Sequence, residues 1–160
     1  MWIVVLTIAT YRDSAGGHSK SIRFVDQDGT RLRILTYRTI GEQLTALTSG
    51  NGSIATPEVG ALGYYFAGRM IDAAGLVSPE AIRFLPVPED QRMGPAAGAI
   101  SVELVRSTYP DWVVTMPIFA QNSLLQSDWF RKYYKLEASV PLPKICYDSL
   151  NVLVFKRRPH

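Results

Sequence analysis

Two carboxylates in the middle of the chain, Glu58 and Asp72, are placed where they could bind a ligand. Glu58 follows the short apolar run "SIAT", and Asp72 ends the run "RMID". Ligands of open α/β sheets bind at the carboxyl ends of the strands, so both side chains could accept hydrogen bonds from sugar hydroxyls. Tyr64 or Tyr65 would then offer a flat apolar face to the sugar ring. The structural alternative is that Glu58 caps the following helix and Asp72 caps the turn in "AAGLVSPE".

Gly60 and Gly63 lie between a predicted strand and a predicted helix. At such a place the backbone can approach a phosphate, and a helix N-terminus attracts anions. However, the carboxylate of Glu58 on the same turn would repel an anion, and Phe66 stands where a dinucleotide-binding pattern needs a third glycine. We therefore favour close packing of the helix against the sheet as the role of Gly60 and Gly63, and we assign Gly75 and Arg69 to the same motif as structural residues.

Two further charged residues are Arg69, a structural residue of the motif, and Asp111, a ligand-binding candidate. Arg69 lies three residues before Asp72 on one strand, so their side chains point to opposite faces and are not expected to pair. Asp111 precedes the strand "DWVVTM" and is a third carboxylate near a strand end, which leaves carboxylate-based acid–base chemistry open without requiring it. We predict no catalytic residues, metal site or cofactor, because the sequence shows no Ser/His/Asp set, metal-ligand spacing or phosphate-binding loop.

A helix over residues 30–48 is predicted from an amphipathic spacing in which Tyr37, Ile40, Leu44 and Leu47 share one face. The glycines of "SGNG" are suited to ending it. The competing interpretation is a hairpin at Asp28-Gly29, which lies between two alternating runs. We favour the helix.

From residue 53 onward, predicted strands alternate with predicted helices. The strands are "SIAT", "RMIDAA" and "DWVVTM", and the intervening helices are "EVGALGYYFAG" and "AAGAISVELVRSTYP". "YYKLEASV" and "LNVLVFKR" are predicted to pair near the C-terminus. The pattern predicts a Rossmann-like α/β layered sandwich, with a mainly parallel central sheet and an antiparallel C-terminal edge pair.

The composition is that of a folded domain. The chain has 160 residues, of which 47% are hydrophobic and 19% charged, so residues 1–160 can form a single domain with a sizeable core. The net charge is only +3 and the basic residues are dispersed apart from "KRR" at 156–158, which argues against a nucleic-acid partner. Cys146 is the only cysteine and is expected in the core.

The N-terminal run "MWIVVLTIA" allows two interpretations. Nine apolar residues are about half of what a membrane helix needs, and no basic region or cleavage site typical of a signal peptide is present. The run is either a buried β-strand or, over residues 1–10, the end of a transmembrane helix that begins upstream.

The segments "YRTIGEQLTAL" and "GSIATPEVGALGYYFAGRMIDAAGLVSPEAI" resemble the region after the last membrane span in bacterial polytopic glycosyltransferases. These enzymes use polyprenyl-phosphate sugars and are similar to the protein mannosyltransferase and arabinosyltransferase superfamily. The resemblance covers residues 36–82 and, more loosely, "DWVVTM" and "LNVLVFKR". The matching residues, in order, are Glu58, Gly60, Gly63, Tyr64, Arg69, Asp72, Gly75, Leu76, Ser78, Pro79 and Glu80.

The family's catalytic carboxylates lie in an early loop between membrane helices, and this chain lacks that loop. The resemblance therefore implies an accessory, non-catalytic C-terminal domain on the extracytoplasmic side of a bacterial cell membrane. The implied partners are the membrane-embedded part of a parent glycosyltransferase and a glycan or polyprenyl-linked sugar. The alternatives are a self-standing domain that binds a small ligand or nucleotide sugar, and a free-standing carboxylate hydrolase.

Overall fold

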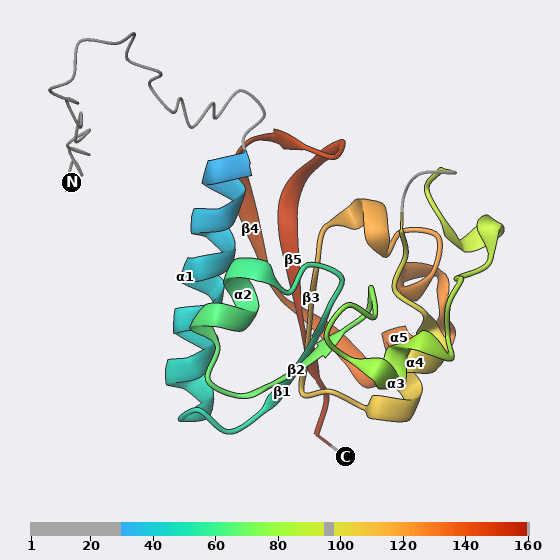
Figure 1. The fold of residues 1–160 in the computed structure, drawn as a ribbon, viewed down its shortest axis with the longest axis horizontal. Helices are drawn as coiled ribbons and strands as arrows, with labels where there is room; N and C mark the ends of the chain where they lie inside the picture. The colour runs from blue at the N-terminus through green and yellow to red at the C-terminus, as the bar shows by residue number, and fades with distance from the viewer. Residues whose placement is uncertain (1–29, 95–97, 160) are drawn as a thin grey trace, which may run out of the picture.

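A computed structural model describes residues 30–94 and 98–159 (Figure 1). The two interpretations of the N-terminal apolar run and the hairpin at Asp28-Gly29 fall outside these residues. The favoured helix is present as α1 (Thr30–Thr48), with the predicted bounds. Ile40 and Leu44 are buried, but Leu47 is 74% exposed, so the predicted apolar face ends one turn early.

A single five-stranded sheet forms the centre of the described fold, with strand order β2-β1-β3-β5-β4. β1 pairs in parallel with β2 and with β3, whereas β5 pairs antiparallel with β3 and with β4. The strands are β1 (Ser53–Thr56), β2 (Arg69–Asp72), β3 (Trp112–Thr115), β4 (Tyr134–Cys146) and β5 (Ser149–Arg157).

The predicted class, a Rossmann-like layered sandwich with a mainly parallel sheet, is therefore wrong. The sheet is mixed, because half of its strand pairings are antiparallel. The physical reason lies in β5, which pairs antiparallel with β4 at one edge, as predicted, but also pairs antiparallel with β3. Its buried residues Val152, Val154 and Phe155 make contacts on both faces of the sheet, so this strand is stable only in an interior position.

The other helices are short. They are α2 (Gly60–Tyr65), α3 (Pro79–Ile82), α4 (Val102–Thr108) and α5 (Asp128–Tyr133), with 3₁₀ turns η1 (Glu89–Gln91), η2 (Pro117–Phe119) and η3 (Leu124–Gln126). The hydroxyl of Ser101 caps α4 by accepting from the Leu104 N–H. Ser127 caps α5 in the same way, by accepting from the Phe130 N–H.

Helices cover both faces of the sheet, and each face has its own core (Figure 1). Successive side chains of a strand point to alternate faces and so belong to different cores. In β3, Trp112 and Val114 pack in one core and Val113 in the other. α1 and α2 pack with the first core, and α3, α4 and α5 with the second. Cys146 is buried in the first core, which confirms its predicted place.

β4 is an edge strand of unusual length, with 13 residues and mostly exposed side chains. Its pairing with β5 shifts register between Leu136 and Ala138 and again between Pro141 and Cys146. The second irregularity contains Pro141 and Pro143, which have no N–H to donate to a ladder.

Candidate functional site

The carboxyl ends of β1 and β2 lie side by side, because Thr56 is in register with Asp72. Glu58 follows the first of these ends and Asp72 forms the second. The structure thus places both predicted carboxylates at the same edge of the sheet, yet gives them different surroundings.

The Glu58 carboxylate bonds to helix α1. One oxygen pairs with a guanidinium nitrogen of Arg33, and the other accepts a hydrogen bond from the Tyr37 hydroxyl at 2.6 Å. The N-cap residue of α2 is Val59, and no side chain caps this helix. The prediction that Glu58 caps α2 is therefore wrong, because Arg33 and Tyr37 supply stronger donors than the first N–H groups of a six-residue helix.

Burial and the carboxylate together fix the protonation of these two donors. Burial raises the pKa of the Tyr37 hydroxyl well above its ordinary value, and the adjacent Glu58 charge raises it further. Burial opposes the charge of Arg33, but the Glu58 carboxylate and neighbouring groups outweigh that penalty and raise the pKa of Arg33. At neutral pH Tyr37 is thus a neutral donor, and Arg33 forms a charged pair with Glu58.

A hollow of about 600 Å³ opens above this pair, between α1, α2 and the end of β1. We call it the α1–α2 hollow. Its rim is apolar and exposed, since Tyr64 is 83% and Leu76 82% accessible to solvent. The lining residues are Arg33, Ile34, Tyr37, Pro57, Glu58, Val59, Gly60, Ala61, Tyr64, Tyr65 and Leu76.

The two neighbouring tyrosines at this rim differ in their exposure and in their contacts. Their rings meet edge to face with centroids 5.0 Å apart. The guanidinium carbon of Arg38 lies 4.8 Å from the centroid of the Tyr65 ring, and Thr45 donates a hydrogen bond to the Tyr65 carbonyl. Tyr65 is thus fixed in place, whereas the ring of Tyr64 is available to a ligand.

Asp72 is buried and lines neither this hollow nor the second one described below. Its carboxylate accepts hydrogen bonds from the N–H groups of Ala74 (2.9 Å), Leu76 (2.6 Å) and Val77 (3.0 Å). The hydroxyl of Ser78 in turn accepts from the Asp72 N–H at 2.8 Å. Asp72 therefore caps the turn that follows β2, which is the structural alternative for this residue.

Asp111 lies at the opposite end of the parallel strands. It accepts hydrogen bonds from the N–H and hydroxyl of Ser53 at 2.9 and 2.8 Å, and its second oxygen pairs with Arg157 at 2.6 Å. These contacts tie together the ends of β1, β3 and β5. Asp111 is thus separated from Glu58 by the length of β1, and the three predicted carboxylates do not form one site.

Packing does not require a glycine at either Gly60 or Gly63. A Cβ added at Gly60 would meet nothing within 4 Å, and one at Gly63 would make an ordinary 3.5 Å contact with Met70. The packing interpretation is therefore wrong for both. Gly75 does need the conformational freedom of a glycine, because its φ is +78° within the turn that Asp72 caps. Arg69 pairs with Glu80 at 3.2 Å and not with Asp72.

Close approach occurs instead at two glycines that the sequence analysis did not single out. A Cβ at Gly41 would lie 3.1 Å from the Leu62 carbonyl oxygen, where α1 crosses α2. A Cβ at Gly68 would lie 2.5 Å from the Gly52 carbonyl oxygen. The signal for Gly41 was present in the sequence, since a glycine inside a helical pattern often has a packing role.

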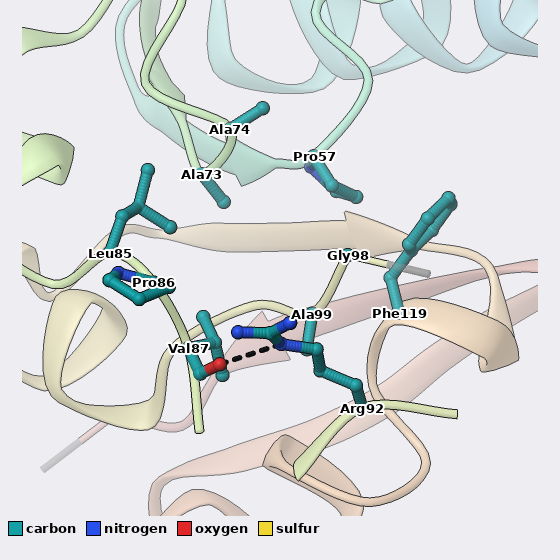
Figure 2. Close-up of a pocket in the computed structure, with 10 residues that line it drawn as sticks. All are labelled: Pro57, Ala73, Ala74, Leu85, Pro86, Val87, Arg92, Gly98, Ala99 and Phe119. Carbon is teal, nitrogen blue, oxygen red and sulfur yellow. Dashed lines mark hydrogen bonds between the residues drawn. The ribbon is translucent and has the colours of Figure 1, made fainter. Parts of the chain in front are cut away.

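A second hollow, of about 480 Å³, lies on the other side of Pro57 (Figure 2). Sequence reasoning missed it, because much of its wall comes from the linker between β2 and α4. The lining residues are Pro57, Ala73, Ala74, Leu85, Pro86, Val87, Arg92, Gly98, Ala99 and Phe119. We call it the switch-point hollow, for the topological reason given below.

Within residues 30–94 and 98–159, no group of three or more His, Cys, Asp or Glu side chains could hold a metal ion. In the same ranges, no helix has both the length and the apolar character needed to span a bilayer.

Residues 21–155 match the sequence profile of a family described as a domain of unknown function, DUF8728. No curated protein and no solved structure matches the chain. Since the match covers most of its length, the chain belongs to the DUF8728 family.

Proposed function

We propose that this member of the DUF8728 family is a non-catalytic, extracytoplasmic accessory domain of a membrane glycosyltransferase, and that its α1–α2 hollow contacts a neutral glycan. The resemblance of residues 36–82 to such enzymes motivates the first part. The observation that supports the second is the lining of the hollow, where the exposed Tyr64 ring stands beside the Glu58 carboxylate and the Tyr37 hydroxyl.

This combination of groups suits a sugar ring. A sugar presents an apolar C–H face and a rim of hydroxyls, and the Tyr64 ring can pack against the former. Each Glu58 oxygen already accepts one hydrogen bond, from Arg33 or Tyr37, but a carboxylate has about four acceptor positions. The free positions can accept from sugar hydroxyls.

The charge balance of the hollow favours an uncharged ligand. Arg33 and Glu58 neutralise each other, so an incoming phosphate would gain little from the cation and would meet the nearby carboxylate. Affinity should be weak, near a millimolar dissociation constant or about 4 kcal/mol, because hydrogen bonds to sugar largely replace hydrogen bonds to water.

The test is a titration of the 160-residue chain with neutral trisaccharides of mannose, arabinose and glucose, followed by amide chemical shifts. We expect shifts in α1 near Arg33 and Tyr37 and over residues 57–65. Tyr64→Ala should weaken binding about fivefold or more, as loss of a stacking contact worth about 1 kcal/mol predicts. Leu136→Ala is the matched control, since it removes an exposed apolar side chain on β4, away from the hollow.

Two results would count against the glycan part: no shifts around the hollow with any of the three sugars, or equal affinity in Tyr64→Ala. The membrane part has its own test in the coding sequence upstream of Met1. A reading frame that continues through several apolar spans supports it, and a stop codon directly upstream would contradict it.

A further inference from the structure

We infer that the switch-point hollow is a second binding site, for a small molecule that joins an apolar body to one carboxylate or phosphate group. The inference depends on the topology of the sheet, the walls of the hollow and the environment of Arg92. It is independent of the proposed glycan contact, which lies in the α1–α2 hollow.

The topology places the hollow at a preferred location for ligands. After β1 the chain continues to β2 on one side, while β3 lies on the other side of β1. Pro57 follows β1 and Phe119 follows β3, and both line the hollow. It therefore opens where connections from two adjacent parallel strands diverge, and this is the crevice in which open α/β sheets bind their ligands.

The walls of the hollow are largely apolar. Figure 2 shows Pro57 and Phe119 on one side and Leu85 and Pro86 on the other, with the small side chain of Ala73 above. Its volume of about 480 Å³ lies within the usual range for small-molecule sites. These walls predict an apolar ligand body of a few carbon atoms.

One charged group interrupts the apolar wall. The Arg92 guanidinium lies among the lining side chains, where its Nε donates to the Val87 carbonyl at 2.7 Å (Figure 2). The Arg92 carbonyl accepts from the Asn122 side chain at 2.9 Å, which holds this segment against the loop after η2. Both ends of the residue are thus fixed in place.

The terminal nitrogens of Arg92 have no partner among residues 30–94 and 98–159. Glu89 and Asp90 precede it in the chain, but neither forms an ion pair with it. A half-buried guanidinium beside apolar walls gains more from an anion than an exposed one does, and its two terminal nitrogens match the paired oxygens of a carboxylate or phosphate. The geometry thus selects an anionic head group.

The test measures binding of four probes to the 160-residue chain by calorimetry and amide shifts: hexanoate, hexyl phosphate, hexanol and inorganic phosphate. We expect at least one of the two amphiphilic anions to bind about tenfold or more tightly than either hexanol or inorganic phosphate. The shifts should centre on Ala73, Ala74, Ala99 and Phe119. Comparison of hexanoate with hexyl phosphate identifies the preferred head group.

Three variants examine the two halves of the site. Arg92→Gln should abolish the preference for the anion while leaving hexanol binding unchanged. Arg83→Gln is the control, because Arg83 is exposed, lies over the Phe84 ring and does not line the hollow. Ala74→Leu adds an apolar side chain at the exposed rim, so it should weaken all three hexyl probes and leave Arg92 in place.

The inference is overturned if hexanol binds as tightly as both anions, or if the anion preference persists in Arg92→Gln. Absence of shifts at about 10 mM of every probe would also overturn it, since even a weak site should respond at that concentration.

Discussion

The loops that follow β1 and β2 begin at the same edge of the sheet and carry a carboxylate each, but they differ in what that carboxylate binds. The loop after β2 turns back on Asp72, which accepts three N–H groups of the same loop. In the loop after β1, the Glu58 carboxylate instead accepts hydrogen bonds from Arg33 and Tyr37 of α1. We call the first the closed loop and the second the open loop.

The comparison shows that the position of a carboxylate at a strand end does not decide its role. A buried carboxylate that accepts several N–H groups of its own loop becomes a structural cap. A carboxylate followed directly by a helix points elsewhere, and its remaining acceptor positions stay open to a ligand. The nature of the next few residues therefore separates a cap from a candidate site.

The largest expected effect is at Asp72. Asp72→Asn should lower the free energy of unfolding by about 3 kcal/mol, because it removes a buried charge that accepts three N–H groups and places an amide donor against them. Urea denaturation measures the change. Asp90→Asn, at an exposed acid of η1, is the control and should shift stability by less than about 0.5 kcal/mol. A similar small loss at Asp72 would remove the distinction between the loops.

The next effect is at Glu58. Glu58→Gln should cost about 1 to 2 kcal/mol, because the amide oxygen can still accept from Tyr37 but the charge that balances Arg33 is lost. The same urea experiment measures it. A loss equal to that of Asp72→Asn would show that the open loop is as tightly determined as the closed one.

The glycines of the two loops should respond with opposite sign. Gly75→Ala should cost about 1 to 2 kcal/mol, because φ is +78° and the new Cβ would meet Leu85 at 3.2 Å. Gly63→Ala should gain about 0.5 to 1 kcal/mol, because the new Cβ would make only ordinary contacts, the nearest with Met70 at 3.5 Å. Thermal unfolding of both variants checks the pair. Destabilisation by Gly63→Ala would restore the packing interpretation of the open loop.

The smallest effect is a dependence on alkaline pH. Burial raises the pKa of Tyr37 in the folded state, so above pH of about 10 the unfolded chain releases this proton while the folded chain keeps it. Stability contributed by Tyr37 is therefore complete below pH 10 and falls as pH rises further. Tyr134, whose pKa burial also raises, adds to this slope. Unfolding measured between about pH 9 and 11 should fall less steeply in Tyr37→Phe, and an unchanged slope would contradict this origin.

The local elements of the fold were predictable because their signals are local. The spacing of Tyr37, Ile40 and Leu44 predicted α1 with its observed bounds. The class of the sheet was not predictable in this way. The class depends on the antiparallel pairing of β5 with β3, in which Val113 lies opposite Phe155. These residues are far apart in the chain, and no short-range sequence pattern indicates that they pair.

The candidate sites show the same limit. The sequence placed Glu58 and Tyr64 at a strand end, but the partners of Glu58 lie 25 and 21 residues earlier and depend on how α1 docks. Asp72 was ambiguous, because a cap and a ligand both satisfy a carboxylate. Arg92 lies in a proline-rich linker, a composition typical of surface loops. Only the folded chain shows that Arg92 lines a hollow.

The long edge strand β4 has a consequence for self-association. An exposed edge normally invites a second copy to add a strand through its free N–H and C=O groups. Here Pro141 and Pro143 remove N–H donors from one half, and the charged side chains of Lys135 and Glu137 cover the other. Concentrated solutions should therefore resist growth of intermolecular sheets through this edge.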